Sequence, residues 1–483
     1  MKQIFMATAT ALMLLLAGTA NANNITVSNV SIAEMNTTSG YVMIQYDISW
    51  ENSWRTSSAP NNWDAAWLFV KYRVGTGDWQ HATLSTSGGE HTAPAGSTID
   101  AGSDGKGVFM YRSADGTGTV SWTNAQLRWE YSTDGVADDA QNVEVKILAI
   151  EMVYVPEGAF YVGDNKTSTA SFFVGGTTNP YQITSEDAIT VANTAGNLYY
   201  TTGLYTGDGE GPIPAEFPKG YAAFYCMKYE ITQGQYAEFL NLLTSMQAAN
   251  RYANENGNYR HTISGTHPNY SASAPDRACN WLSWADGIAY MDWSGLRPMT
   301  ELEYEKACRG TQTPVANEYA WGTTTIAGGS AYLLSNFGAA NEGIVANYST
   351  TAGNCSYSTT DGSIDGPLRV GIFAAHANNT GRVTSGASYY GIMEMSGNLW
   401  ERSVTVGNAT GRNFTGVNGD GILDAWGHAD MTNCPDNSAV GSGFRGGNWH
   451  YDSYYCRTSD RYLAANTNTY RLYYYGFRGV RCP

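Results

Sequence analysis

The sequence predicts an α+β protein, in which an all-β sandwich precedes a larger region of short strands, few helices and long ordered loops. Its 483 residues exceed one compact core, so two or three domains are expected. The chain is 42% hydrophobic and 13% aromatic, which excludes a largely disordered protein. The 54 Gly and 34 Tyr residues favour strands and loops over helical bundles.

The charge balance is acidic. The 27 basic and 43 acidic residues give a formal net charge of −16. A chain of this charge repels phosphate backbones and anionic lipid, so we expect neither nucleic acid nor a membrane surface as a partner. No stretch of the mature chain reaches about 18 uninterrupted apolar residues, so we expect no membrane span.

Residues 1–22 have the features of a signal peptide. Lys2 supplies the positive charge, residues 4–16 are largely apolar, and Ala20 and Ala22 are the small residues that a signal peptidase requires. No Cys follows the predicted cleavage site, so we expect no bacterial lipid anchor. We therefore predict an exported protein that is periplasmic, cell-surface or extracellular.

The cysteines are seven in number, and export makes disulfides permissible. Because seven is odd, at least one is free or paired between chains. No CxxC motif occurs, which argues against zinc ribbons and thioredoxin chemistry. The positions are Cys226, Cys279, Cys308, Cys355, Cys434, Cys456 and Cys482.

Residues 23–146 are predicted to form the β-sandwich, of the immunoglobulin or fibronectin kind. Residues 42–50 alternate apolar and polar, which indicates a half-buried strand, and 66–73 and 127–131 are similar. Turn residues separate these runs, as in an antiparallel sandwich. Seven tryptophans lie here, and they either pack in the core or form an aromatic platform for sugars.

A second domain is predicted over residues 147–483, after the polar stretch 134–142. Three of its helices are predicted by capping boxes, in which a hydroxyl and a side chain three residues later accept hydrogen bonds from free backbone amides. The pairs are Thr232 with Gln235, Ser283 with Asp286, and Thr300 with Glu303. Beyond Gly310 the chain is rich in Gly, Asn and Ser for about 80 residues, and loops of that length are usually functional or held by ions.

Six sequence blocks in this second domain resemble the formylglycine-generating enzyme, or sulfatase-modifying factor, family. They occur in the family's order over about 330 residues. The resemblance implies a C-type-lectin-like fold with small twisted sheets, two or three helices and long ordered loops. The blocks are 152–163 (MVYVPEGAFYVG), 224–232 (FYCMKYEIT), 296–305 (LRPMTELEYE), 395–401 (MSGNLWE), 445–449 (RGGNW) and 476–478 (GFR).

The resemblance also implies a copper(I) centre, which formylglycine-generating enzymes build from two cysteines five positions apart after the Gly-Gly block. Two soft thiolates suit copper(I). Here Tyr451 and Cys456 stand at those positions. We therefore expect no copper and assign no catalytic residue; Cys456 would be one only under an oxidase interpretation. The seven histidines show no paired helical spacing, so the iron chemistry of related enzymes is unsupported too.

Calcium is expected as a structural cofactor, because acidic loops with free carbonyls suit a hard cation that takes six to eight oxygens. By resemblance, two sites are predicted. The first uses Glu394, the carbonyls of Gly397 and Leu399, and Glu401. The second uses Asn347, the Tyr348 carbonyl, Asp361 and the Ser363 carbonyl. Alternatively, Glu401 pairs with an arginine and Asp361 caps a turn.

Residues 448–475 have the composition of a binding surface, since eight of the 28 are Tyr and half of the others are Asn, Asp, Ser or Thr. Tyr offers stiff amphipathic contact area, and the short polar residues offer adaptable hydrogen bonds. The segment resembles the variable region of proteins diversified by retroelements, which carry it on this fold. The predicted ligand-binding residues are Asn448, His450, Tyr451, Asp452, Tyr454, Tyr455, Thr458, Asp460, Tyr470, Tyr473 and Tyr475.

These observations predict an exported protein that recognises a protein or glycan ligand through its Tyr-rich C-terminal face. One alternative is a formylglycine-generating oxidase that modifies sulfatases. Another is carbohydrate adhesion through the tryptophans of the N-terminal domain. The missing second cysteine favours binding over catalysis.

Overall fold

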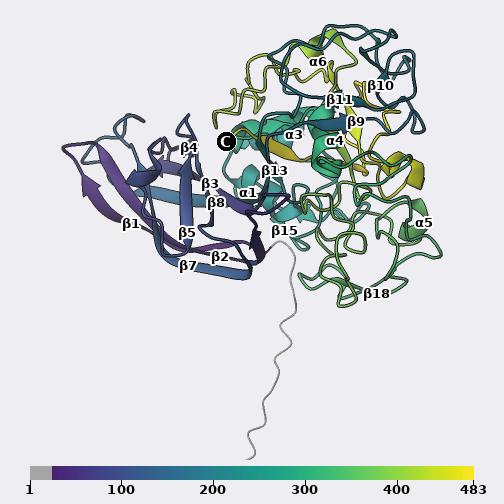
Figure 1. The fold of residues 1–483 in the computed structure, drawn as a ribbon. Coiled ribbons are helices and arrows are strands. Elements are labelled where there is room, and N and C mark those ends of the chain that lie inside the picture. The colour runs from purple at the N-terminus through teal and green to yellow at the C-terminus, as the bar shows by residue number, and fades with distance from the viewer. Residues whose placement is uncertain (1–23) are drawn as a thin grey trace, which may run out of the picture.

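The computed structural model describes residues 24–483, so the predicted signal peptide lies outside the described residues. Figure 1 shows an N-terminal part built of strands and a larger C-terminal part in which short elements are joined by long loops. The C-terminus lies between the two parts (Figure 1), where Arg481 pairs with Asp104 at 2.6 Å.

The N-terminal part contains an antiparallel sheet in the order β1-β2-β7, formed by Thr26–Asn36, Tyr41–Arg55 and Gly116–Trp129. Val42, Ile44, Tyr46, Ile48 and Trp50 of β2 are buried and alternate with more accessible residues, apart from the buried Met43. The alternation in the sequence therefore predicted this strand and its inward face correctly.

A larger sheet continues from the N-terminal part into the C-terminal part, in the order β16-β22-β13-β8-β3-β6-β5, with β4 paired to β3. Strands β3 and β8 are antiparallel over eleven residues each, so one long ladder links the two parts. The strands are β3 (Asp64–Val74), β4 (Gln80–His81), β5 (Ser97–Ala101), β6 (Val108–Arg112), β8 (Val143–Val155), β13 (Phe224–Met227), β16 (Arg297–Pro298) and β22 (Gly479–Arg481).

Strand β3 is buried on both faces because it separates two hydrophobic cores. Leu68 and Val70 face the core shared with β2 and β7. Trp67 and Phe69 face the core of the C-terminal part, where Phe69 contacts Trp293 with ring centroids 5.3 Å apart. The predicted domain boundary at residues 146/147 falls inside β8. A separate immunoglobulin-like sandwich stays a prediction, since this sheet belongs to both parts.

The three helices announced by capping boxes are confirmed, with both reciprocal hydrogen bonds at each N-cap. They are α1 (Gln233–Asn241), α3 (Trp284–Trp293) and α4 (Glu301–Arg309). A fourth capping box, Thr244 with Gln247, begins α2 (Ser245–Arg251), which the sequence analysis missed. Short helices α5 (Ser358–Asp361) and α6 (Ala409–Arg412) lie in the long loops.

The rest of the C-terminal part is short strands and loops. Strand β19 (Trp400–Val404) is the middle of a small sheet, antiparallel to β20 (Ser442–Arg445) and parallel to β21 (Tyr475–Gly476). The other strands are β9 (Phe160–Val162), β10 (Phe173–Val174), β11 (Tyr181–Ile183), β12 (Leu198–Tyr199), β14 (Ile263–Ser264), β15 (Ser271–Ala272), β17 (Leu333–Ser335) and β18 (Gly343–Ala346). Two 3-10 turns are η1 (Gly88–Glu90) and η2 (Ser453–Cys456).

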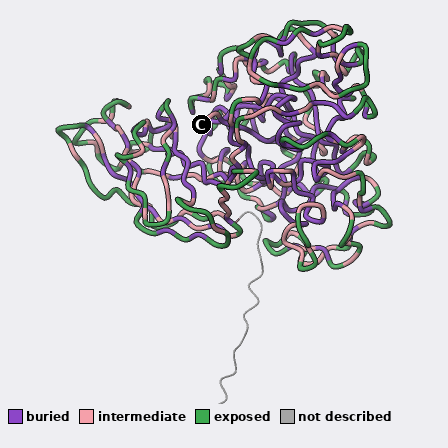
Figure 2. Tube along the Cα trace, viewed as in Figure 1, coloured by how far each residue is buried: buried purple, intermediate pink, exposed green. Residues whose placement is uncertain are grey.

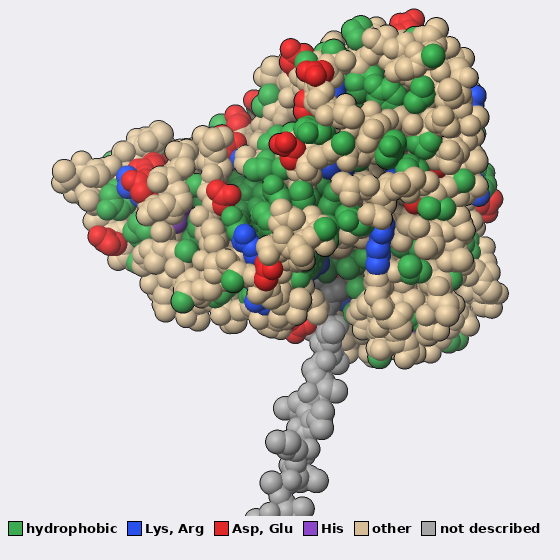
Figure 3. All heavy atoms as spheres, viewed as in Figure 1, with side chains coloured by type: hydrophobic (Ala, Val, Ile, Leu, Met, Phe, Trp, Pro, Cys, Tyr) green, Lys and Arg blue, Asp and Glu red, His purple; other side chains and the backbone are tan. Residues whose placement is uncertain are grey.

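Burial is dense in the C-terminal part despite its loops, as the tube in Figure 2 shows. The face drawn in Figure 3 is largely uncharged, which agrees with a chain that is only 14% charged. Among residues 24–483, no helix has the length and apolar character needed to cross a bilayer.

Candidate functional site

The Tyr-rich segment leaves β20 and returns at β21, and both strands pair with β19. Its two ends are therefore fixed on either side of one strand, while residues 446–474 run outward as loop and the single turn η2. A long segment held at both ends by a rigid sheet can present side chains in a fixed arrangement.

Buried residues of this segment attach it to the rest of the C-terminal part. Arg461 forms an ion pair with Glu301 at 2.6 Å, and both side chains are inaccessible to solvent. The Asn448 carboxamide oxygen accepts hydrogen bonds from the backbone amides of His450 (2.7 Å) and Tyr451 (3.0 Å), which fixes the turn before the exposed residues. Trp449 is buried and its amide donates to the Asn398 carbonyl.

Aromatic rings form a connected chain along the surface of the segment. The Tyr454 and Tyr455 centroids lie 4.1 Å apart, and Tyr451 lies 5.6 Å from Tyr455. Tyr474 joins Tyr451 at 5.3 Å and contacts Tyr473 at 4.6 Å. We call these five residues, with His450, the tyrosine patch. Tyr451 and Tyr454 are exposed, and Tyr470, 70% exposed, lies in the same segment.

Two aromatic residues outside the segment extend the tyrosine patch. The Tyr259 ring stacks on Tyr473 with centroids 4.0 Å apart, and Trp281 meets the same ring edge-on at 5.8 Å. Both have positive φ, 48° for Tyr259 and 63° for Trp281, a conformation that costs energy in bulky residues and often marks functional positions. Neither lies in a sequence block that could have revealed it.

Some predicted ligand-binding residues are not at the surface. Asn448, Thr458, Asp460 and Tyr475 are all buried. Tyr475 belongs to β21 and stacks on Phe444 at 4.3 Å, so it packs in the small sheet. These four residues support the segment, because the composition of a stretch does not reveal which of its members point inward. His450, Asp452 and Tyr470 are exposed, in the places that a contact surface requires.

A cluster of buried carboxylates lies directly beneath the tyrosine patch. Glu230 accepts hydrogen bonds from the Asn398 side chain (2.5 Å) and the Leu399 amide (3.0 Å). The loop then enters β19, and the amide of its first residue, Trp400, donates to the Tyr474 carbonyl at 2.9 Å. The sequence analysis did not predict Glu230 as a site residue. The signal that could have revealed it is a charged residue between the apolar neighbours Tyr229 and Ile231.

The charges of this cluster are poorly balanced. Glu401 pairs with Arg478 at 2.6 Å, which is the pairing that the sequence analysis left open. The Glu394 carboxylate accepts from the Gly371 amide at 2.8 Å, while one oxygen of Glu394 and one of Glu401 are buried without a hydrogen-bond partner among residues 24–483. Burial raises the pKa of Glu394 to about 7, and burial and the neighbouring carboxylates raise the pKa of Glu230 well above its usual value.

This geometry suits a hard cation. Three carboxylates face Arg478, with Arg369 also near Glu394, so the negative groups outnumber the positive ones. Glu394 has a positive φ of 53°, which is strained backbone for this residue. The acid oxygens of Glu230, Glu394 and Glu401 are not all within 4.8 Å of one another, so backbone carbonyls of the 397–399 loop would have to complete the shell. A calcium ion would supply the missing positive charge at this position.

The predicted second calcium site has a different setting. The Asn347 side chain is exposed and donates to the Ala331 carbonyl at 2.5 Å. Asp361 is buried and accepts from the amides of Asp365 (3.0 Å) and Gly366 (3.4 Å), so it closes the turn after α5. Burial raises the pKa of Asp361 to about 7. Tyr348 donates its hydroxyl to the Thr384 carbonyl at 2.8 Å. Asn347 and Asp361 thus hydrogen-bond to different backbone groups, and this site, with Ser363 in the same loop, stays a prediction.

The positions of the family's copper centre do not form an accessible dithiol. Tyr451, at the first position, has an exposed ring, and Cys456, at the second, is fully buried. The thiol neighbouring Cys456 is Cys355, from a different loop, and it is buried as well under Tyr319 and Trp321. A metal held there would be sealed from a substrate, so these residues do not fit the family's oxidase centre.

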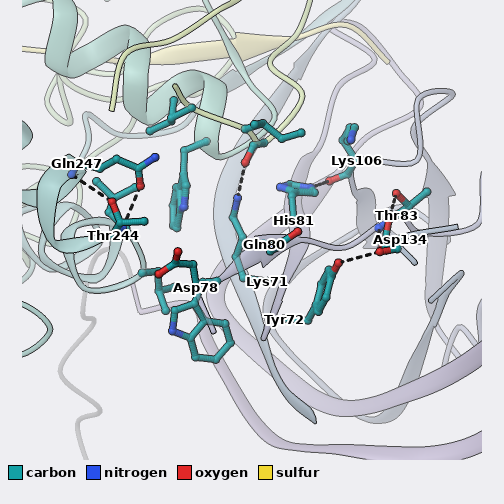
Figure 4. Close-up of a pocket in the computed structure, with 17 residues that line it drawn as sticks. Lys71, Tyr72, Asp78, Gln80, His81, Thr83, Lys106, Asp134, Thr244 and Gln247 are labelled. Carbon is teal, nitrogen blue, oxygen red and sulfur yellow. Dashed lines mark hydrogen bonds between the residues drawn. The ribbon is translucent and has the colours of Figure 1, made fainter. Parts of the chain in front are cut away.

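A cavity of about 360 Å³ lies at the junction of the two parts (Figure 4). Lys71 of β3 is buried and donates to the Gly421 carbonyl at 3.0 Å, while His81 of β4 bonds the Lys106 carbonyl at 2.7 Å. Thr244 and Gln247 face them from α2 (Figure 4). Desolvation lowers the pKa of both Lys71 and His81. Residues of both parts of the chain thus line this cavity.

Three aspartates lie close together behind this junction. Oxygen atoms of Asp292, Asp420 and Asp430 lie within 4.8 Å of one another, which holds for no other acidic, His or Cys triplet among the described residues. The buried Asp292 carboxylate accepts from the amides of Asp420 (3.1 Å) and Asp430 (3.0 Å). It therefore anchors the 420–430 loop to the end of α3.

The tryptophans of the N-terminal part are mostly structural. Trp50, Trp67, Trp122 and Trp129 are buried, and Trp50 meets Trp122 edge-on at 5.3 Å. The other three, Trp54, Trp63 and Trp79, are half-buried. An exposed platform of tryptophans for sugars is therefore not seen in the described N-terminal residues, and adhesion through this part stays a prediction.

The comparisons with known proteins agree with the six sequence blocks. The family described as "Sulfatase-modifying factor enzyme 1-like domain" matches residues 137–483. The chain therefore belongs to the sulfatase-modifying factor family. The formylglycine-generating enzyme of Mycobacterium tuberculosis (strain ATCC 25618 / H37Rv) is 31% identical over 126 residues, which are 26% of this chain and 32% of that protein. The match spans about a third of that relative's length.

Proposed function

We propose that this chain is an exported ligand-binding protein, which recognises a protein or glycan through the tyrosine patch. The observation that carries this proposal is the connected set of rings on a segment whose ends and base are fixed by β19 and by buried polar contacts. Tyrosines that are held in place lose little entropy on binding and offer both apolar area and hydroxyls.

Calcium is part of the proposal, as a structural ion below the patch. The 397–399 loop connects the two, because Asn398 bonds Glu230 on one side and accepts from the Trp449 amide on the other. Trp449 in turn contacts Tyr473, with ring centroids 5.5 Å apart. A cation held by Glu394, Glu401 and the carbonyls of Gly397 and Leu399 would therefore stiffen the base of the patch.

The rival function is oxidation of a sulfatase cysteine, as the family membership and the relative's name suggest. It requires a copper(I) centre that a peptide can reach, and Cys456 is buried. Copper(I) titration of the purified chain, followed by incubation with a cysteine-containing sulfatase peptide, separates the two functions. The proposal predicts no formylglycine in the peptide; stoichiometric copper(I) bound through Cys456 with peptide oxidation would overturn it.

Binding itself is tested with arrays of immobilised oligosaccharides and purified surface proteins. We expect the full chain to bind a defined subset, and Tyr451→Ser with Tyr454→Ser to lose at least about tenfold in affinity, since such aromatic anchors are each worth over 1 kcal/mol. Tyr205→Ser is the matched control, because Tyr205 is 43% exposed but lies outside the patch. Equal loss in the control and the double variant would contradict the assignment.

Diversification of the tail is a separate part of the proposal. Residues 448–475 combine a buried framework with exposed Tyr and short polar residues, which is the division expected of a variable region. Sequencing the DNA downstream of the coding region tests it. A near-copy of the tail codons that differs at adenines, beside a reverse transcriptase gene, is the expected result; intact flanking DNA without such a copy would refute diversification.

A further inference from the structure

Two buried cysteines from distant parts of the sequence lie side by side below the tyrosine patch. Cys355 belongs to the loop before α5, and Cys456 ends η2. Their thiols are within hydrogen-bonding reach of each other, in a pocket closed by Tyr319, Trp321 and Tyr357. Neither side chain is accessible to solvent beyond 1%.

The backbone around the two thiols holds them together. The Ser396 hydroxyl donates to the Cys456 carbonyl at 2.7 Å, and the Asn398 amide donates to the Ser356 carbonyl at 2.9 Å. Gly397 lies between these two anchors, and a Cβ there would collide with the Cys355 Sγ. A Cβ added at Gly447 would likewise collide with the Cys456 Sγ. Two glycines thus leave the space that the sulfur atoms share.

We propose that Cys355 and Cys456 form an intrachain disulfide in the mature protein. The two thiols lose two protons and two electrons, and a new S–S bond joins them. The electrons reduce a disulfide of an oxidoreductase or a small molecule, which leaves as two thiols after a mixed-disulfide step. Both thiols are buried, out of reach of an oxidoreductase, so the exchange takes place before the loops close over them.

The cross-link joins the two segments that flank the patch. Besides the thiols, these segments share two hydrogen bonds: the Ser358 amide donates to the Tyr451 carbonyl at 3.0 Å, and its hydroxyl donates to Asp452 at 3.2 Å. A disulfide here would close a loop of about 100 residues, and long loops give the largest stabilisation in the chain-entropy description.

The inference is tested on the full chain, refolded in a mixture of reduced and oxidised glutathione. The protein is alkylated under denaturing conditions, digested and analysed by mass spectrometry with and without a reductant. We expect a linked peptide pair that contains Cys355 and Cys456 and disappears on reduction. Alkylation of both thiols in all molecules, or a link from either one to a different cysteine, would overturn the proposal.

Thermal unfolding provides a second readout that does not depend on peptide mapping. Reduction of the wild-type chain should lower Tm by about 5–10 °C. The variant Cys355→Ala with Cys456→Ala should show the same Tm with and without reductant. Cys279→Ala is the control, since Cys279 is buried in another core, and it should keep the reductant-dependent shift. An equal shift in the double variant would contradict the disulfide. The test is independent of ligand binding, so its failure would leave the proposed function standing.

Discussion

The N-terminal part and the C-terminal part of this protein are ordered by different interactions. In the N-terminal part, two sheets enclose an apolar core, and ion pairs such as Arg73–Glu144 lie at the surface with side chains 34% and 51% exposed. In the C-terminal part, regular elements are few, and many ion pairs are buried. Arg297–Glu303 and Arg478–Glu401, for example, are both at 2.6 Å with almost no exposure.

The difference shows how a loop-rich domain can be rigid. A loop cannot satisfy its backbone groups as a sheet does, so buried side chains must do so. Glu303 pairs with Arg297 and also accepts from the Thr300 amide at 2.9 Å, which joins β16 to the start of α4. Such pairs fix position more than they add net stability, because each ion first loses its hydration.

The largest expected effect comes from breaking one of these buried pairs. Arg297→Met leaves Glu303 charged and buried, which should lower the free energy of unfolding by about 3–5 kcal/mol. Urea unfolding measures it. Arg73→Met is the matched control at an exposed pair, and a change of about 0–1 kcal/mol is expected there. Similar effects at both positions would mean that the two parts are held by the same forces.

An apolar truncation tests the sheet side of the comparison. Ile44 is inaccessible in the core between β2 and β3, so Ile44→Ala should cost about 2–5 kcal/mol. Because β3 and β8 belong to both parts, we expect the whole chain to unfold in one transition, whose midpoint shifts as a unit. Two separate transitions by fluorescence and circular dichroism would show that the parts are independent.

A smaller effect is expected from protons at the carboxylate cluster. The pKa of Glu394 is about 7 in the calcium-free chain, and calcium binding requires its carboxylate form. Affinity should therefore fall by up to about tenfold per pH unit as Glu394 is protonated below about pH 7. Calorimetric titration with calcium at several pH values measures this slope. Glu394→Gln should reduce the slope, and a pH-independent affinity in the wild type would refute the site.

The smallest effect on stability is expected at the tyrosine patch. Tyr451→Ser and Tyr454→Ser change exposed side chains, so each should alter the free energy of unfolding by no more than about 0.5 kcal/mol. Urea unfolding of both variants beside the wild type measures this. A loss above about 2 kcal/mol would show that the rings are part of the fold, and the surface would then lose its interpretation as a binding face.

Regular elements were predictable from the sequence, whereas contacts between distant loops were not. Capping boxes at Thr232, Ser283 and Thr300 encode helix starts locally, and the alternation around Ile44 encodes a strand. The continuous sheet across residues 146/147 was not predicted. Residues 66–73 were predicted as a half-buried strand, but β3 is buried on both faces because a second core packs against it.

The same limit applied to the site. The tyrosine patch was visible from composition, but the inward direction of Asn448 and Tyr475 depends on the turn and strand that hold them. The site also includes residues brought in by tertiary contacts, which no local sequence pattern predicts: Tyr259, Trp281 and Glu230. The proximity of Cys355 and Cys456 could not be predicted for the same reason.

The central claim is that the tyrosine patch contacts the ligand, and hydrogen exchange tests it most directly. The amides of the full chain are compared with and without the strongest-binding oligosaccharide or protein from the arrays. The account predicts slower exchange at 450–455 and 470–474, together with the neighbouring loop at Tyr259. Protection confined to residues 24–142, with unchanged exchange in the Tyr-rich segment, would contradict it.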